Sequence, residues 1–516
     1  MQQSQSKQQV GGILGFIERI GNKIPDITIL FISAFLLVCV VSAVLAQIHF
    51  NYVHPATGRP IEITNMLSGK ALVDLMSKMV TNYANFPPLS MVIVATLGIG
   101  IADGSGYINT GLKKILSITP KVLITPVVIL VGMLSHLGPD SGYVIIIPIA
   151  AYMFYAVGKH PLAGIAASFA GIAGAFAANY TPSAIDPVIQ GFTQSAAQII
   201  DPGYQVNVLC NYFYAFASTF IVIGACWWVT EKITNPWLWK ACPLDDDLDL
   251  GNENNSSITP SESRAFKIAT AVLLLMLTGL AAALYPADSI LRAPDGVIAS
   301  FKAPIMQSIV SLIFIFAALV GLVYGIACGK FKSPKDVTAA MEEITKTLVQ
   351  LIVFYFFAAQ FLYAFGASNM GALIAVSGAE FLKSLNLPPQ VTVFGIIVFV
   401  ALLNLIITSA SAKWAILAPI FVPMLMAVGI APELTQVAFR VSDSAVNVVT
   451  PMFAFYPLII LYCQKYVKNA GIGTLSSMML PYTIALLVSL TFMLYLFWWL
   501  DIPLGFQADY VYPRRF

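Results

Sequence analysis

Charged and amide side chains interrupt an apolar stretch in the second half of this chain. Arg440, Asp443 and Asn447 follow one another in a run that breaks at Thr450 and Pro451. Arg can bind a carboxylate with two hydrogen bonds, whereas Asp can bind a cation or carry a proton. Such side chains are costly at bilayer depth and tend to mark the path of an ion or substrate. The pattern therefore predicts half of a transport site.

Arg440 and Asp443 also have a purely structural interpretation. Residues spaced i,i+3 are neighbours on a helix, so these two side chains could simply pair with each other. We favour a functional role in which Arg440 binds an anionic substrate. Asp443 would then hold Arg440 in place, bind the coupling cation or titrate. A Na⁺ ion near Asp443 and Asn447 is the one metal that we consider, and we expect no other cofactor.

A second set of polar residues could supply oxygen ligands. Ser409 and Ser411 lie in TSASAK at 408–413, Asp140 lies in SHLGPDSG at 135–142, and Asn179 and Asp186 lie in NYTPSAIDP at 179–187. These oxygens, with the exposed carbonyls of broken helices, would suit a hard cation such as Na⁺. The serines could instead cap helix ends, and Asp186 could be a helix N-cap or a proton or cation site. Asp103 is a weaker candidate because it could lie at the solvated end of a span.

The two halves of the chain share a repeat that connects these segments. A shift of 271 residues, without a gap, superposes Ile145, Pro148, Ile149, Met153, Ala156, Val157, Gly158 and Pro161 on Ile416, Pro419, Ile420, Met424, Ala427, Val428, Gly429 and Pro432. Apolar residues match by chance, but a glycine and two prolines at the same spacing are harder to explain that way. In secondary transporters, the broken helices of two inverted repeats meet at the substrate site. We therefore expect one site that both halves share.

The composition is that of a membrane protein. Of the 516 residues, 58% are hydrophobic and only 10% are charged, and the mean hydropathy is +0.82. These values exclude an ordinary soluble domain, and many apolar runs approach the length that crosses about 30 Å of hydrocarbon. We expect no cleavable signal peptide, because the run at 27–46 fits a first span better. Six Cys without a C-x-x-C pair and four His without metal-ligand spacing favour neither a disulfide framework nor a zinc site.

The expected fold is an all-α polytopic membrane protein with about nine transmembrane helices and two re-entrant helical hairpins in an inverted repeat. The first half, 1–230, contains a hairpin at about 122–157 and a broken helix at 162–187. A cytoplasmic linker, 231–266, leads to the second half, 267–516, with a hairpin at about 391–428 and a broken helix at 434–456. Each apolar piece of a hairpin is short for a full crossing. Met66–Met79 shows helical spacing and predicts either an interfacial helix or a helix packed on the protein's own surface.

Positive charge orients this layout. Most of the 27 Lys and Arg residues fall in segments that the layout places inside when the N-terminus is inside and the C-terminus outside. The rule does not distinguish a re-entrant hairpin from two spans, because either choice leaves the later loops on the same sides.

Several motifs resemble the AbgT family of p-aminobenzoyl-glutamate transporters. They are TSASAKWAILAPIFVPM and FRVSDSAVNVVTP in the second half, GKHPLAGIAASFAG and NYTPSAIDP in the first, and IERIGNKIPDITILFI and LPYTIALLVSL…DIPLGF near the ends. The resemblance covers nearly the whole chain. It implies a homodimer of nine-span protomers, each with two re-entrant hairpins and a bowl open to the cytoplasm. The membrane would be the bacterial inner membrane, with a cytoplasmic N-terminus and a periplasmic C-terminus.

The resemblance also implies a function and a set of residues. The function would be transport of p-aminobenzoyl-glutamate or related folate catabolites, coupled to Na⁺ or H⁺, with export of sulfonamide drugs as the alternative. Carried over by motif, the functional residues are Asp186, Ser411, Trp414, Arg440, Asp443 and Pro451. Trp414 would stack on the substrate ring, although core packing or interfacial anchoring would explain it as well. Lys413 places a further cation at the hairpin tip, where it would alter the charge that a substrate meets.

Other functional classes fit the sequence less well. No G-x-x-x-x-G-K-[ST] loop supports an ATP-driven pump, and neither H-E-x-x-H nor G-x-S-x-G supports an intramembrane peptidase. A channel could use the same re-entrant elements, but it could not accumulate a solute against its gradient. We therefore predict a secondary active transporter and no enzyme. Its partners would be a small anionic substrate, the lipid bilayer and a second copy of the chain, with no nucleic acid.

Overall fold

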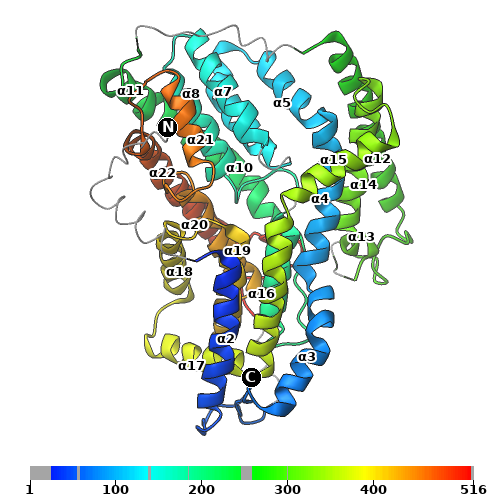
Figure 1. Ribbon diagram of the computed structural model, residues 1–516, viewed down its shortest axis with the longest axis vertical. Helices are drawn as coiled ribbons and strands as arrows, with labels where there is room; N and C mark the ends of the chain where they lie inside the picture. Colours follow the sequence, from blue (N-terminus) through cyan, green and yellow to red (C-terminus); the bar gives the residue numbers. More distant parts are fainter. Residues whose placement is uncertain are drawn as a thin grey trace, which may run out of the picture.

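The protein is built almost entirely from helices. The computed structural model describes residues 25–54, 58–137, 141–183, 185–245, 258–298, 300 and 302–512 (Figure 1). The first half contains α2 (Ile27–Leu45), α3 (Gly69–Ala84), α4 (Pro87–Ser105), α5 (Tyr107–Ser117), η1 (Lys121–Leu123), α6 (Ile124–Leu134), η2 (Ser135–Leu137), α7 (Ser141–Ala156), α8 (Pro161–Phe169), η3 (Ala170–Gly174), α9 (Ile185–Ala197), α10 (Tyr212–Val229), η4 (Thr230–Thr234) and α11 (Asn235–Ala241).

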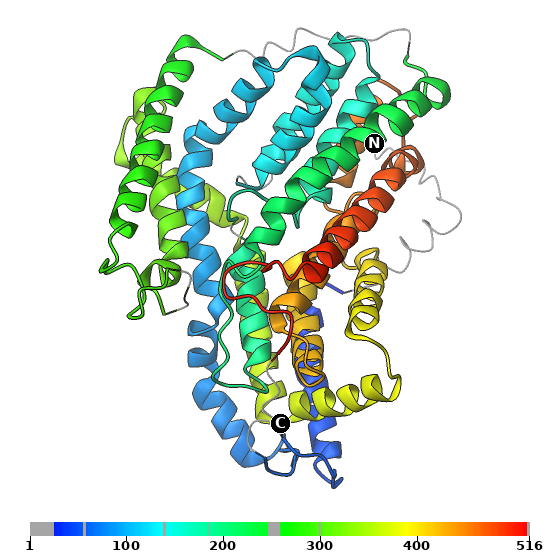
Figure 2. The ribbon, with the colours of Figure 1, turned by 180° about the vertical axis from the view of Figure 1, so that it is seen from behind.

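The second half continues with helices of similar length. They are α12 (Pro260–Leu284), α13 (Pro304–Gln307), α14 (Ile309–Ala327), α15 (Pro334–Lys346), α16 (Val349–Ala367), α17 (Met370–Ser384), α18 (Pro389–Asn404), α19 (Ala410–Met426), α20 (Pro432–Val446), α21 (Tyr456–Gln464) and α22 (Ile472–Trp499). The segment after α22 returns to the middle of the molecule (Figure 2). There its backbone bonds to the turn before α20, from Tyr512 N to Gly429 O and from Ala431 N to Tyr510 O.

Seven helices of the described chain are long and apolar enough to cross a membrane, or up to eight if the bent pair α17 and α18 forms one span. The seven are α2, α3 with α4, α10 with η4 and α11, α12, α14, α16 and α22. They correspond to the seven unbroken spans of the predicted layout. The two remaining predicted spans are the broken ones, α8 with η3 and α20, and each is too short to pass the same test. The all-helical membrane fold is therefore confirmed.

The helix predicted around Met66–Met79 is present as α3, shifted toward the C-terminus. It runs in line with α4 in Figure 1, and the two count as one candidate span, Gly69–Ser105. The Tyr83 hydroxyl of α3 donates to Ile352 O of α16 at 2.8 Å, and Asn82 bonds to Gln360 of α16 at 3.3 Å. The C-terminal end of α3 therefore packs on the protein itself, while Leu72, Val73 and Met76 are exposed, and the choice between the two alternatives stays a prediction.

Helix α17 was not expected from the sequence. In Figure 1 it lies across the lower end of the molecule, beside the ends of α2 and α16, and the chain then bends by 117° into α18. Helices α6 and α7 occupy the first predicted hairpin, and α18 and α19 occupy the second. None of these four helices exceeds 17 residues. Their re-entrant character remains a prediction.

The repeat detected in the sequence is also a repeat of local structure. Gly158 and Gly429 both adopt positive φ, at 78° and 88°, after the C-termini of α7 and α19. In the first turn, Gly158 N donates to the carbonyl oxygen three residues earlier, and the amide after it donates to the carbonyl oxygen five residues before that amide. In the second turn, Gly429 N and Ile430 N make the same two bonds. This left-handed helix end favours glycine, because a Cβ would be strained there. Pro161 and Pro432 then begin α8 and α20.

Candidate functional site

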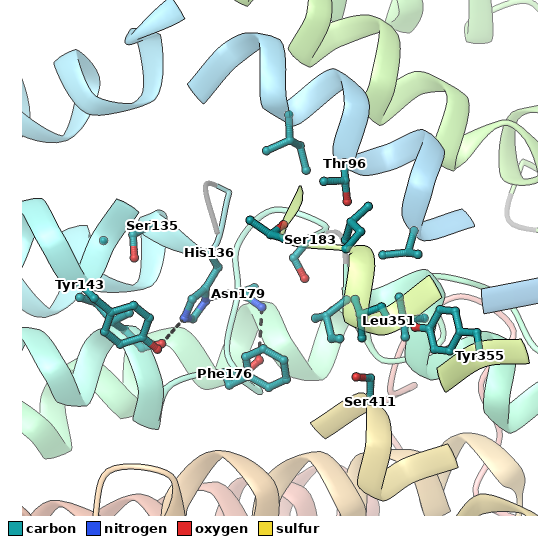
Figure 3. Close-up of a pocket in the computed structure, with 18 residues that line it drawn as sticks. Thr96, Ser135, His136, Tyr143, Phe176, Asn179, Ser183, Leu351, Tyr355 and Ser411 are labelled. Carbon is teal, nitrogen blue, oxygen red and sulfur yellow. Dashed lines mark hydrogen bonds between the residues drawn. The ribbon is translucent and has the colours of Figure 1, made fainter. Parts of the chain in front are cut away.

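A cavity of about 340 Å³ lies where the first hairpin, the segment after η3 and helices α4, α9 and α16 meet (Figure 3). Its walls are mostly apolar. Tyr143 of α7 and Tyr355 of α16 lie on opposite sides of it, and Phe176 lies between them. A few polar side chains converge on the same space, namely Thr96, Ser135, His136, Asn179, Ser183 and Ser411. An apolar cavity with aromatic rings and few polar groups is typical of a site for a small organic ligand.

His136 connects the tip of the first hairpin to the broken helix. Its Nδ1 lies 2.5 Å from Asn179 Oδ1, and its Nε2 lies 2.6 Å from Ile172 O in η3. The Asn179 amide is oriented by donation from its Nδ2 to Phe176 O at 3.4 Å. His136 therefore bonds through both ring nitrogens, one to the Asn179 side chain and one to the backbone of η3.

Glycines allow the hairpin to approach η3 closely enough for these bonds. A Cβ on Gly171 would lie 2.5 Å from Ile129 O of α6, and a Cβ on Gly132 would lie 3.1 Å from Gly171 Cα. Any side chain at either position would push the two backbones apart. The Gly- and Ala-rich composition of this region therefore reflects close packing, as small residues do at helix contacts in membranes. The π-helical geometry of η3 is itself frequent at functional sites.

Arg440 pairs with the other half of the protein and not with Asp443. Its Nη1 lies 2.6 Å from Asp186 Oδ1 at the start of α9. Asp186 Oδ2 accepts from Ser183 N at 2.7 Å and Ser183 Oγ at 3.0 Å, so Asp186 lies in the first turn of α9 and bonds back to the segment before it, and it is not the N-cap that the sequence allowed. The alternative in which Arg440 and Asp443 pair across one helix face is therefore not the pairing that the structure has. Because α20 packs against α9, the carboxylate nearest to Arg440 comes from Asp186 of α9 and not from its own helix.

The guanidinium of Arg440 keeps one unused donor. Its side chain is 4% exposed, and its Nη2 has no hydrogen-bond partner among the described residues. Arg440 borders a small cavity of about 10 Å³ together with Asp186 and Asn211. Asn179 borders this small cavity and the larger one. The side chain of Asn179 therefore stands between the larger cavity and the arginine.

Asp443 pairs with Lys413 instead. Lys413 Nζ lies 2.6 Å from Asp443 Oδ1, and both side chains are completely buried. The ammonium also donates to Asn404 Oδ1 at the end of α18. Asn404 Nδ2 in turn donates to Asp443 O at 2.7 Å and to Asn447 Oδ1 at 3.0 Å. The ammonium therefore contacts the carboxylate near which a Na⁺ ion was predicted.

Trp414 is part of the protein core. Its side chain has no exposed surface, its Nε1 donates to Thr193 Oγ1 at 2.9 Å, and its ring stacks on Phe439 at 4.4 Å between centroids. Ser409 caps α19 by accepting from Ala412 N. In the structure, Trp414 therefore has the core-packing role and Ser409 the helix-capping role that the sequence allowed as alternatives.

The remaining predicted residues are divided between the two cavities and their surroundings. Ser411 and Asn179 line the larger cavity, and Asp186 and Arg440 line the smaller one. Pro451 follows the end of α20 just after Thr450, whose hydroxyl donates to Leu405 O at 2.8 Å. Asp140 lies outside the described residues, and Asp103 lies near the C-terminal end of α4.

The sequence reasoning missed several residues of the larger cavity. They are His136, Tyr143, Phe176, Ser183 and Tyr355. His136 carried a usable signal, because it stands in the same polar interruption as Asp140. Phe176 and Tyr355 carried none, because their neighbours along the chain are apolar and only packing brings them to the cavity.

Comparison with known proteins identifies the family. The family described as "AbgT putative transporter family" matches residues 12–512. The chain belongs to the AbgT family. The p-aminobenzoyl-glutamate transport protein of Escherichia coli (strain K12) is 33% identical over 513 residues, which cover 99% of this chain and 98% of that protein.

Two solved structures of related transport proteins share the fold. The YdaH transporter of Alcanivorax borkumensis is 37% identical, with a TM-score of 0.87 over 93% of this chain and all of that one. The Neisseria gonorrhoeae protein MtrF, whose structure is said to illuminate a class of antimetabolite efflux pumps, is 39% identical, with a TM-score of 0.90 over 96% of this chain and all of that one. This AbgT family member is thus a multi-pass membrane transporter of a bacterial family, and it is not an enzyme.

Proposed function

We propose that the protein is a secondary active transporter of p-aminobenzoyl-glutamate or a related folate catabolite, coupled to a cation gradient. The observation that carries the proposal is the aromatic-walled cavity beside a buried arginine with an unused donor. The substrate has an aromatic ring, an amide and two carboxylates, which need an apolar wall, hydrogen-bonding groups and cationic donors. The full-length similarity to the Escherichia coli p-aminobenzoyl-glutamate transport protein supports the same substrate class.

The cavity suggests how such a molecule would bind. The benzoyl ring would lie in the space between Tyr143 and Tyr355, which stand on opposite sides of the cavity. Ser411 and Asn179 would bond to the amide. A carboxylate would reach the Nη2 of Arg440 once the Asn179 side chain turns aside, because Asn179 separates the two cavities. Bonds from a guanidinium to a carboxylate are among the stronger ones in proteins.

Trp414 would act indirectly in this arrangement. Its ring face is occupied by Phe439, and it holds Thr193 of α9 against α19. We therefore assign to Trp414 the positioning of α19, on which Ser411 lies. Ser409 would likewise position the start of α19, and Pro451 would position the segment that follows α20.

The proposal includes an orientation and an assembly. The positive charge pattern of the loops supports a cytoplasmic N-terminus and a periplasmic C-terminus in the bacterial inner membrane. A homodimer is proposed from the family resemblance. Within each protomer, the two repeat halves with their re-entrant hairpins would rock about the shared site, as in other secondary transporters.

Export of sulfonamide antimetabolites is the second candidate function. The similarity to MtrF, a member of a class of antimetabolite efflux pumps, favours it. A sulfonamide drug shares the aminophenyl ring but lacks the two carboxylates, so it would use the aromatic walls without requiring Arg440. The two candidates therefore differ in their dependence on cationic side chains.

Transport by the purified full-length protein in proteoliposomes tests both candidates. Labelled p-aminobenzoyl-glutamate and a labelled sulfonamide would be offered separately, under an imposed Na⁺ gradient or an imposed H⁺ gradient. We expect accumulation of p-aminobenzoyl-glutamate under one of the two gradients. Equilibration without accumulation under both gradients would indicate a channel, and accumulation of the sulfonamide alone would favour the second candidate. Replacement of Na⁺ by choline at fixed membrane potential separates the two coupling ions.

A further inference from the structure

A cavity of about 640 Å³ lies where the base of the first hairpin meets α10 and η4, at the end of the molecule where Figure 1 places α7, α8 and α11. Lysines from three separate elements line it, namely Lys121 of η1, Lys159 of the turn between α7 and α8, and Lys232 of η4. Helix α10 packs against α6, and η4 packs against α8, so tertiary contacts bring these segments together. We call this space the lysine cavity. It opens to the surface, because Lys121 and Lys232 are exposed.

Two of the three lysines carry charge that the protein does not neutralise. Lys159 Nζ lies 2.5 Å from Glu231 Oε1 and donates to Thr125 Oγ1 at 3.0 Å, so these two charges balance each other. Lys121 and Lys232 have no ion-pair partner among the described residues. The lysine cavity therefore offers two free ammonium groups. Ammonium groups of this kind bind phosphate as point charges.

Tryptophans place the lysine cavity at the surface of the bilayer. Trp227 and Trp228, in the last turn of α10, line the cavity and are 38% and 59% exposed. They belong to the candidate span Tyr212–Ala241, which also carries the exposed Trp237 and Trp239. Tryptophan is enriched where the hydrocarbon of a membrane meets the headgroups. The two free lysines therefore lie at the depth at which lipid phosphates are found.

Helix α10 also provides a notch for a hydrocarbon chain. Phe220 and Trp228 are exposed, and Gly224 lies between them at a spacing of four residues, so the three positions share one face of the helix. The position that a Cβ would take on Gly224 is open, with no atom within 4 Å. Val122 and Val157 add apolar walls to the same cavity. The site thus combines positive charge with an apolar groove.

We propose that the lysine cavity binds an anionic phospholipid of the surrounding bilayer. The lipid phosphate would lie between the ammonium groups of Lys121 and Lys232, and one acyl chain would follow α10 through the notch at Gly224. Basic pockets between transmembrane helices bind anionic headgroups in this way. The bound lipid would tie the base of the first hairpin to α10. This inference goes beyond the proposed function, because it concerns a lipid ligand and not the transported substrate.

Other occupants fit the lysine cavity less well. In a twofold contact centred on this face, the same lysines of two protein copies would approach each other. Like charges across an interface oppose association. A soluble phosphate ion would use the lysines but would leave the notch at Gly224 empty. A phospholipid uses both features.

Quenching of tryptophan fluorescence by brominated lipid tests the site in the full-length protein. The protein would be reconstituted in phosphatidylcholine vesicles that contain a small fraction of phosphatidylglycerol brominated on its acyl chains. A matched series would contain brominated phosphatidylcholine instead. We expect brominated phosphatidylglycerol to quench at the lower mole fraction, because it carries a net negative charge. Trp227→Phe with Trp228→Phe should remove this selective quenching. Equal quenching by the two lipids would overturn the proposal.

Two sets of substitutions examine the headgroup and the acyl chain separately. Lys121→Gln with Lys232→Gln should weaken the binding of phosphatidylglycerol by about 25-fold, or about fivefold for each lysine. Lys121→Arg with Lys232→Arg keeps both charges and should retain binding. Gly224→Leu also keeps both charges, but it fills the notch and should weaken binding as well. Unchanged selectivity in both the glutamine pair and Gly224→Leu would overturn the proposal.

Matched controls lie outside the lysine cavity. Lys332→Gln with Lys335→Gln removes two exposed lysines at the start of α15. Gly279→Leu places the same new side chain on α12, where the space around the Cβ position is also open. Both controls should bind phosphatidylglycerol as the unmodified protein does. An equal loss of binding in the controls would indicate general attraction to the membrane and contradict a site at the lysine cavity.

The remaining outcomes distinguish the occupants and the proposals. Excess inorganic phosphate should not reduce the quenching, and if it does, the cavity binds a soluble anion and not a lipid. A change in oligomeric state on Gly224→Leu, without selective lipid binding in the unmodified protein, would make this face a protein interface and overturn the proposal. If the glutamine pair does not fold, Gly224→Leu decides, because its side chain enters open space. The measurement needs no substrate and no gradient, so its failure would leave the proposed transport function intact.

Discussion

Arg440 and Asp186 form an ion pair that joins residues 254 positions apart in the chain. Nη1 of Arg440 lies 2.6 Å from Oδ1 of Asp186, and the bond connects α20 of the second half to α9 of the first. Arg440 therefore has two relationships at once, because its Nη1 contacts Asp186 and its Nη2 has no partner in the described structure. The bond from Nη1 to Asp186 holds the two halves together, whereas Nη2 is the donor that we assign to the substrate.

We predict that Arg440→Ala lowers both stability and transport. Removal of one partner leaves the Asp186 carboxylate without its counter-ion, which costs about 3 kcal/mol for a largely buried pair. Thermal unfolding in detergent should show a lower midpoint, and uptake of p-aminobenzoyl-glutamate into proteoliposomes should be lost.

A double variant separates the two effects. Arg440→Gln with Asp186→Asn removes both charges, so the midpoint should recover most of its loss, whereas uptake should stay abolished. Asp186→Asn keeps an oxygen that can accept from Ser183 N and is the matched single variant. Normal uptake by the double variant would exclude Arg440 from substrate binding.

We predict that His136→Gln weakens the binding of the anionic substrate. The side chain of Gln cannot bond to both Asn179 and Ile172 O in the positions that the two ring nitrogens occupy, so Asn179 loses its support beside the cavity. Loss of a buried hydrogen bond costs roughly 1–3 kcal/mol, which corresponds to a rise in KM of about 5- to 150-fold. Uptake kinetics in proteoliposomes give KM and kcat separately.

The control for that substitution is another histidine. His49 is exposed, so His49→Gln should leave KM unchanged. If His136→Gln lowers kcat alone and leaves KM at its original value, His136 does not support substrate binding.

We predict that Gly158→Ala and Gly429→Ala each destabilise the protein by about 1–2 kcal/mol. Both glycines have positive φ, and a Cβ is strained in that conformation. The shift in thermal midpoint should be similar for the two variants, because the two turns repeat the same hydrogen bonds. Gly279→Ala is the matched control, because Gly279 lies within α12, lacks positive φ and has open space around its Cβ position. An equal loss in the control would contradict the explanation from φ.

Local patterns in the sequence predicted much of this fold because their causes are local. Long apolar runs can be satisfied only as helices in hydrocarbon, so the seven unbroken spans follow from hydropathy. Pro161 and Pro432 begin helices because proline tolerates the first turn and not the interior. Gly158 and Gly429 end helices because their backbone has positive φ, a conformation in which a Cβ would be strained. Helix α17 escaped prediction because its 15 residues mix apolar and polar types without a clear boundary signal.

The sequence by itself thus determined that the protein lies in a membrane, where its helices break, and which polar residues stand at the breaks. Only the tertiary structure decided how those residues pair. Spacing along one helix suggested Arg440 with Asp443, but the structure joins Arg440 to Asp186 and Asp443 to Lys413. Helical periodicity tells which side chains share a face and not which helix packs against that face. Because a buried charge is stabilised by the nearest opposite charge in space, the assignment of partners depends on that packing.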